Sequence, residues 1–152
     1  MGGSERPRRR FGRFGADLEA VFGDRVKIRC ENTGGDRMVL GDPVLLDGVF
    51  QNLIKNGAEH VNDLTDEVER VVNVELTHQN RQVVVSVNNG GAPVPAERLT
   101  TFFEKFNTDK KGGTGLGTTY AYMVTRAHGG EITIRSNTTE GTTVTVMLPQ
   151  MS

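Results

Sequence analysis

The sequence predicts one soluble domain in which helices and strands are mixed, a fold of the α/β class. Its 152 residues are enough for a single domain with a hydrophobic core of its own. Residues 42–54 repeat apolar side chains at helical spacing, whereas residues 82–88 run apolar or alternate as a strand does. No apolar run approaches the length that spans a membrane, so the whole chain is expected to be soluble.

Composition narrows the range of partners and compartments. The formal net charge is −1, so bulk electrostatics favour neither nucleic acid nor an anionic membrane surface as a partner. Cys30 is the single cysteine, which precludes an internal disulfide and favours a reducing, cytoplasmic setting. One cysteine and 3 scattered histidines lack the spacing of a zinc site.

The first segments of the chain are short. Residues 1–15 are rich in glycine and arginine and are interpreted as a flexible tail or an expression leader, so the domain proper would be residues 16–152. A basic arm for an acidic partner is the alternative. Residues 16–22 are expected to form a short helix. Residues 25–30 alternate polar and apolar side chains as a half-buried strand does, and residues 37–40 would complete a hairpin with them.

Asp42 and Pro43 open the first strong helix, because aspartate suits the N-cap and proline the first helical position. Apolar side chains then define a core face: Leu45, Leu46, Val49, Phe50, Leu53 and Ile54. A polar stripe runs beside that face: Asn52, Asn56, Glu59 and Asp63. Asparagine is a mediocre helix former, so two of them one turn apart suggest a use, such as offering the Asn56 oxygen to Mg²⁺. Simple solvation of both asparagines is the alternative.

Two strands and a polar loop come next. Residues 71–77 and 82–88 are predicted strands, with a turn at residues 78–81 that joins them as an antiparallel hairpin. The second strand runs into Asn89, Gly90 and Gly91, which places polar groups and bare backbone at a sheet end, a common location for a ligand. A short helix over residues 95–102 follows. Three phenylalanines then form either core or a hydrophobic latch under a loop: Phe102, Phe103 and Phe106.

A glycine-rich loop precedes the last predicted helix. Residues 108–117 (TDKKGGTGLG) contain four glycines and lead into a helix over residues 118–128. Glycine lets backbone amides approach an anion, and a helix start adds unpaired N–H groups, so the loop is predicted to hold phosphate. A flexible surface loop is the alternative, and the pattern is neither a Walker loop nor a dinucleotide fingerprint. Residues 131–136 and 142–148 alternate as strands of a closing hairpin.

Taken together, these segments resemble the catalytic ATP-binding domain of sensor histidine kinases, within the GHKL ATPase superfamily and its Bergerat fold. The similarity lies in four boxes: QNLIKNGAEH (51–60) for the asparagine box, VNNGGAPVP (87–95) for the first glycine box, FFEKF (102–106) for the phenylalanine box and GGTGLGTTYA (112–121) for the second glycine box. HGGEITIRS and EGTTVTVMLP are similar to the closing strands of the family. Four boxes in this order are far more specific than any single glycine motif.

The resemblance implies a two-layer α/β sandwich, in which helices cover one face of a mixed, mostly antiparallel sheet and ATP lies on the helical side. It implies binding of Mg-ATP and ADP and transfer of the γ-phosphoryl group to a histidine on a separate dimerisation domain. A response regulator would be the indirect partner in two-component signalling. No segment here resembles that helical domain, so the chain is interpreted as the ATP-binding module of a longer kinase, monomeric in isolation and without membrane contact.

Site residues follow from the resemblance by position. Asn56 would be the catalytic Mg²⁺ ligand, Asn52 would support the phosphates, and Asn89 would recognise the adenine amine. The wall beside the base and the base of a mobile lid are assigned to Gly91, Pro93, Phe103 and Phe106. The remaining nucleotide-binding candidates are His60 in the asparagine box and Lys110, Lys111, Gly113, Thr114, Gly115, Leu116 and Gly117 around the second glycine box.

Three departures from the pattern of the family motivate a first alternative, and the missing histidine segment alone motivates a second. Asn89 stands where aspartate is usual, Glu59 stands where a basic residue is frequent, and the lid over residues 107–112 is short. The first alternative is a non-catalytic nucleotide-sensing or partner-binding module on the same fold. The second is a stand-alone serine kinase of the anti-sigma type, although Asn52 then stands where those kinases carry a glutamate base.

Overall fold

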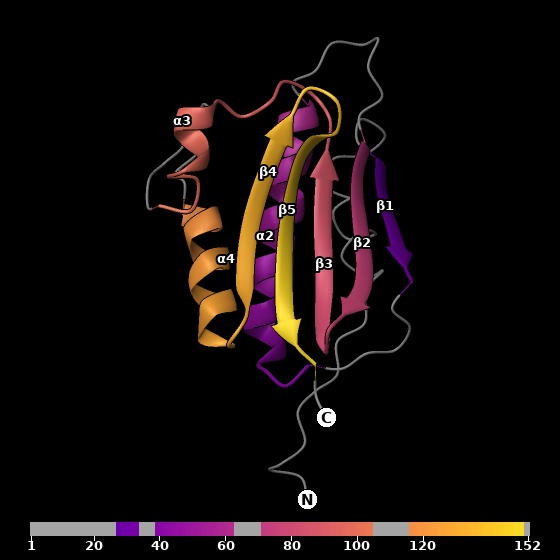
Figure 1. Ribbon diagram of the computed structural model, residues 1–152, viewed down its shortest axis with the longest axis vertical. Helices are drawn as coiled ribbons and strands as arrows, with labels where there is room; N and C mark the ends of the chain where they lie inside the picture. The colour runs from indigo at the N-terminus through magenta and orange to yellow at the C-terminus, as the bar shows by residue number, and fades with distance from the viewer. Residues whose placement is uncertain (1–26, 34–38, 63–70, 105–115, 151–152) are drawn as a thin grey trace, which may run out of the picture.

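The computed structural model describes residues 27–33, 39–62, 71–104 and 116–150 of the chain. The elements in chain order are β1 (Lys27–Asn32), α2 (Pro43–Asn62), β2 (Val71–Gln79), β3 (Gln82–Asn89), α3 (Ala96–Leu99), α4 (Leu116–Ala127), β4 (Glu131–Asn137) and β5 (Gly141–Pro149). Figure 1 shows α2 behind β4 and β5, with α4 beside it. The strands and helices therefore form two layers.

The five strands form one sheet in the order β1-β2-β3-β5-β4. β1 runs parallel to β2, and the other three pairs of neighbouring strands are antiparallel. The expected mixed, mostly antiparallel sheet with helices on one face is therefore confirmed. β3 and β5 pair although two helices and another strand separate them in sequence, so the centre of the sheet is built from non-local contacts.

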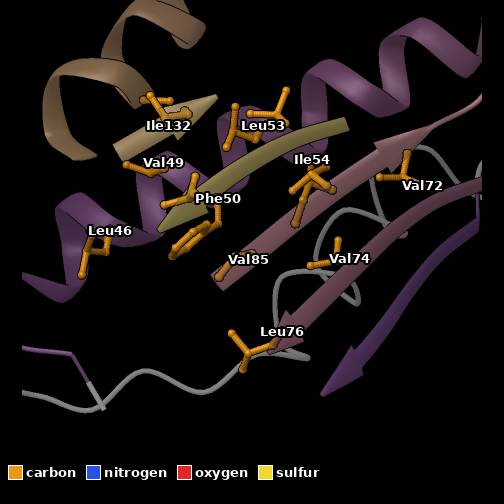
Figure 2. Close-up of a cluster of buried hydrophobic side chains, with 14 of the residues drawn as sticks. Leu46, Val49, Phe50, Leu53, Ile54, Val72, Val74, Leu76, Val85 and Ile132 are labelled. Atoms are coloured by element: carbon orange, nitrogen blue, oxygen red, sulfur yellow. The ribbon is translucent and has the colours of Figure 1, made fainter. Parts of the chain in front are cut away.

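The core lies between α2 and the helix-facing side of the sheet (Figure 2). α2 contributes a buried stripe made of Leu46, Val49, Phe50, Leu53 and Ile54. In β3 every second residue is buried, in the series Val83, Val85, Val87 and Asn89. Because side chains alternate across a strand, Asn89 continues the row of valines and faces the helical layer. A polar side chain thus stands at the end of an otherwise apolar row.

The start of α2 agrees with the sequence prediction. The Asp42 carboxylate accepts hydrogen bonds from the backbone N–H groups of Val44 at 2.9 Å and Leu45 at 3.2 Å. These bonds satisfy two of the donors that a helix start leaves unpaired, and Pro43 occupies the first helical position. The cap fixes where the apolar stripe of α2 begins.

Two contacts hold α4 against α2. The Tyr120 hydroxyl donates a hydrogen bond to the Leu45 carbonyl at 3.1 Å, and a Cβ added to Gly48 would lie 2.6 Å from that hydroxyl oxygen. At the other end of α4, His128 Nε2 accepts a hydrogen bond from the Asp42 backbone N–H at 3.1 Å. Both contacts therefore fix α4 against the N-terminal part of α2.

Several sequence predictions are corrected by the strand pairing. The hairpin expected between residues 25–30 and 37–40 is wrong, because β1 takes β2 as its parallel neighbour and Val39 instead forms an antiparallel bridge with Gln150. His78 belongs to β2 rather than to the turn. The turn consists of Asn80 and Arg81, whose φ angles of 49° and 64° suit a two-residue hairpin.

Two helix boundaries also differ from the prediction. α3 covers four residues and is followed by turns, so it is shorter than expected over residues 95–102. α4 begins at Leu116, two residues before the predicted start, so Leu116 and Gly117 belong to the first turn of the helix. The helix expected over residues 16–22 lies outside the described residues.

Candidate functional site

Asn89 is a buried polar side chain at the end of β3, with 6% of its surface exposed. Its Nδ2 donates a hydrogen bond to the Gly90 carbonyl at 2.9 Å. Its Oδ1 faces α2 at Gly57, where an added Cβ would lie 3.3 Å from that oxygen. Within the part of the chain that the structure describes, no group donates a hydrogen bond to Oδ1. A buried acceptor is therefore available for a ligand beside α2.

The loop after Asn89 is fixed at one point and open at another. The Val94 backbone N–H donates to the Ser136 hydroxyl at 2.8 Å, and that hydroxyl lies 2.7 Å from the Thr142 hydroxyl. A Cβ added to Gly90 would meet nothing within 4 Å. β4 and β5 thus hold the far end of the loop, while the space beside Gly90 stays open. Gly91, with φ of 102°, and the exposed Pro93 lie between these points, and their role beside a base remains a prediction.

Asn52 and Gly117 bring the asparagine box and the second glycine box into contact. Asn52 Nδ2 donates a hydrogen bond to the Gly48 carbonyl one turn earlier, at 2.7 Å. A Cβ added to Gly117 would lie 2.6 Å from Asn52 Oδ1, closer than a carbon atom approaches without displacing its neighbour. Glycine at this position therefore lets α4 start directly against Asn52 without displacing the Asn52 side chain.

The phenylalanine box is attached to the same end of α4. The Thr118 hydroxyl donates to the Phe102 carbonyl at 3.2 Å, and the Thr119 hydroxyl donates to the Phe103 carbonyl at 3.1 Å. The Phe103 ring stacks on Tyr122 with centroids 5.8 Å apart and an interplanar angle of 23°. Phe102 and Phe103 are partly buried against the core, as the core interpretation of the box predicted for these two residues, whereas the latch interpretation stays a prediction.

Asn56 and His60 follow Asn52 along α2. Asn56 lies one turn after Asn52 and is partly buried, next to the glycine that faces Asn89. His60 is also partly buried, and among the described residues its Nε2 has no hydrogen-bond partner. Glu59 is exposed on the same helix. The structure thus collects three of the predicted site residues on one helix, although their contacts with a nucleotide remain predictions.

The remaining predicted site residues are described in part or not at all. Leu116 is placed by its backbone in the first turn of α4. Seven further residues named above, together with the lid, lie outside the described residues: Asp63, Phe106, Lys110, Lys111, Gly113, Thr114 and Gly115. Their predicted roles are unchanged by the structure.

The donor set fits magnesium held jointly with phosphate. Across residues 27–33, 39–62, 71–104 and 116–150, no group of three or more His, Cys, Asp or Glu side chains could hold a metal ion. Magnesium in nucleotide sites keeps several waters and takes one or two protein oxygens plus phosphate oxygens. A single amide oxygen such as that of Asn56, near the Asn52–Gly117 contact, agrees with such a site.

Sequence reasoning missed three kinds of contact. Gly57 faces the Asn89 amide, Ser136 and Thr142 hold the loop, and the hydroxyl of Thr118 holds the phenylalanine box. The contact of Gly57 could have been predicted, because a glycine inside a strongly periodic helix usually has a packing reason. Serine and threonine are common on alternating strands, so the other residues gave no comparable signal.

Comparison with known proteins gives the class to which this fold and site belong. Residues 41–152 match the family described as histidine kinase-, DNA gyrase B- and HSP90-like ATPases. The chain therefore belongs to that family, as the four boxes predicted. None of the helices in the described ranges is long and apolar enough to cross a membrane.

Curated relatives narrow the resemblance to kinases. The chain is similar to sporulation kinase C of Bacillus subtilis, with 33% identity over 136 residues that cover 90% of this chain and 31% of that kinase. It is also similar to the sensor protein CutS of Streptomyces coelicolor, with 35% identity over 149 residues that cover 88% of this chain and 35% of that protein. The chain thus spans about a third of the length of these relatives.

Solved structures confirm the fold. The catalytic domain of the histidine kinase ThkA superposes with a TM-score of 0.76 at 23% identity and covers 96% of each chain. Full-length ShkA, solved in complex with AMPPNP, gives a TM-score of 0.75 at 17% identity and covers 97% of this chain and 32% of that one. The chain therefore shares its fold with catalytic domains of histidine kinases.

Proposed function

We propose that this domain binds Mg-ATP and donates the γ-phosphoryl group to a histidine on a separate dimerisation domain, as the ATP-binding part of a two-component kinase. The observation that supports the proposal is the double contact of α2. Asn52 touches Gly117 at the start of α4, and Gly57 faces Asn89 at the end of β3. One helix therefore joins the segment predicted to hold phosphate to the side chain predicted to recognise the base.

The spacing along α2 suits a nucleotide. Asn52 and Gly57 are five residues apart, which corresponds to a rise of about 7.5 Å and a rotation of about 140° around the helix axis. Asn56 lies between them in sequence, one turn after Asn52. The rotation turns Gly57 toward β3 while Asn52 faces α4, so a ligand lying along α2 between these two elements would meet Asn89 at one end and the first turn of α4 at the other.

Each predicted site residue that the structure describes would bind or orient the substrate. Asn89 Oδ1 would accept a hydrogen bond from the adenine amine, since no described group occupies it. The first turn of α4 would offer unpaired backbone N–H groups and a positive dipole end to phosphate. Asn56 and Asn52 would orient the metal and the phosphates. Magnesium, when bound, neutralises charge on the transferring phosphoryl group, and the histidine nucleophile would come from the separate domain for in-line transfer.

Two alternatives are weaker on the same observations. A serine kinase that needs a base at Asn52 is disfavoured, because a carboxamide takes no proton and its Nδ2 is held by the Gly48 carbonyl. A non-catalytic nucleotide-sensing or partner-binding module is favoured only by the identities of Asn89 and Glu59 and by the short lid over residues 107–112. Proposed kinase activity also implies a cytoplasmic setting, where Mg-ATP is available.

Calorimetric titration tests the binding step. The chain should bind ATP and ADP, more tightly with Mg²⁺ than without it, and Asn56→Ala should remove the Mg²⁺ dependence. Asn73→Ala is the matched control, since Asn73 is exposed on β2, where its neighbours Val72 and Val74 face the core. Unchanged Mg²⁺ dependence in Asn56→Ala would remove that residue from the site.

Label transfer tests the chemical step. The domain joined to dimerisation helices from a similar sensor kinase, supplied with γ-labelled ATP, should place the label on the histidine of those helices. Binding of Mg-ATP without label transfer would favour the non-catalytic alternative.

A further inference from the structure

The Asn89 carboxamide retains both a donor and an acceptor at the candidate base site. An amide nitrogen carries two hydrogens, and one of them is used on the Gly90 carbonyl at 2.9 Å. The second N–H and Oδ1 receive no partner from the residues that the structure describes. With 6% of the side chain exposed, these two groups lie at the inner end of the site rather than in bulk water.

A donor beside an acceptor complements two classes of purine. The edge of adenine at C6 and N1 offers an amine donor and a nitrogen acceptor. The corresponding edge of guanine or hypoxanthine offers a carbonyl acceptor, O6, and an N1–H donor. A carboxamide can pair with either edge, whereas a carboxylate only accepts and would leave O6 facing a like charge.

Reversing the amide costs little in this structure. Rotation would turn Oδ1, an acceptor, toward the Gly90 carbonyl and forfeit the hydrogen bond that sets the present orientation; Gly90 is exposed, so water can solvate its carbonyl instead. One net hydrogen bond corresponds to about tenfold in affinity. Gly57 and Gly90 carry no side chains, and a Cβ at Gly90 would meet nothing within 4 Å, so neither neighbour blocks the rotated amide or a shifted base.

We infer that Asn89 makes this a site for 6-oxopurine as well as 6-aminopurine nucleoside triphosphates, with only a modest preference for ATP. The inference rests on the proposed nucleotide function and extends it to the choice of base. A site whose fixed polar group finds no hydrogen-bond partner on the wrong base would bind that base with an affinity lower by several orders of magnitude. The Asn89 amide avoids that penalty because it can offer the base either an N–H donor or an Oδ1 acceptor.

Inosine triphosphate is the sharpest probe, because it carries O6 and N1–H but lacks the 2-amino group of guanine. Calorimetry should compare ATP, ITP and GTP with Mg²⁺ on the intact chain and on Asn89→Asp. The wild-type chain should bind ITP within about tenfold of ATP. Asn89→Asp should raise the ratio of ATP to ITP affinity by at least about tenfold, since its carboxylate only repels O6. Asn73→Asp, with the same charge change on an exposed strand position, should leave the ratio unchanged.

The outcomes separate this inference from the proposed function. Tight ATP binding with ITP more than about a hundredfold weaker would overturn the inference and leave the proposed function standing. An equal ratio in the wild type and a folded Asn89→Asp chain would show that another group selects the base, which also overturns it. Absence of binding by all three nucleotides would overturn both. If Asn89→Asp fails to fold by circular dichroism, the wild-type ratio decides alone.

Discussion

Replacing Gly117 by alanine tests the contact on which the phosphate end of the candidate site depends. The new Cβ would lie 2.6 Å from Asn52 Oδ1, roughly 1 Å closer than an ordinary contact of about 3.5 Å. Asn52 must therefore turn and lose its 2.7 Å hydrogen bond to the Gly48 carbonyl. That bond is worth about 1 kcal/mol, and an unfavourable side-chain rotamer adds about 1 kcal/mol. Alanine offsets up to about 1 kcal/mol because it favours a helix.

The expected net loss is about 1 kcal/mol in the free energy of unfolding, or about 4 °C in the melting temperature. Urea unfolding should measure Gly117→Ala alone and combined with Asn52→Ala. Without the Asn52 amide the new methyl meets no obstacle there, so alanine becomes neutral or stabilising and the coupling energy reaches about 2 kcal/mol. Gly90→Ala is the control, because its Cβ would meet nothing within 4 Å. Equal destabilisation in both backgrounds would refute the reasoning.

Three further substitutions test other parts of the framework by urea or thermal unfolding. Gly141→Ala should destabilise the fold by about 3 kcal/mol or more, because the residue has φ of 80° and its Cβ would overlap the Asn89 carbonyl oxygen. Unchanged stability of this variant would contradict the β3–β5 register. Asp42→Ala should cost about 1 kcal/mol through loss of the α2 cap, and Asp42→Asn should retain most of that stability. Thr125→Val should be neutral or up to about 1 kcal/mol stabilising, because among the described residues the buried Thr125 hydroxyl has no partner; a loss above about 1 kcal/mol would reveal one.

The sequence predicted those parts of the fold that depend on residues close together in the chain. The Asp42 cap, the apolar stripe of α2 and the alternation of β3 were readable because each depends on residues within one or two turns of chain. The hairpin of β2 and β3 was predicted, but its turn was predicted two residues too long because Asn80 and Arg81 lack the glycine that normally marks a tight two-residue turn. The four boxes together indicated the fold class, which no single segment indicates alone.

The pairing of segments that lie far apart in the chain could not be predicted from the sequence. β1 was assigned to a local hairpin because proximity in sequence favours it, yet its partner β2 lies beyond the whole of α2. The Asn52–Gly117 contact and the Gly57–Asn89 contact likewise join segments that no periodicity relates. The boxes predicted that these segments share a site, but only the structure shows which atoms are in contact.

The position of α2 explains why the two ends of the candidate site should respond together. Its buried stripe fixes the helix against β2 and β3, while Gly48 accepts the Tyr120 ring of α4. A shift of α2 along its axis would therefore move Asn52 relative to Gly117 and Gly57 relative to Asn89 at once. Core substitutions under α2, such as Phe50→Leu, should consequently weaken affinity for the whole nucleotide more than for its separated base or phosphate parts. Equal losses for the nucleotide and its parts would mean that the two ends are positioned independently.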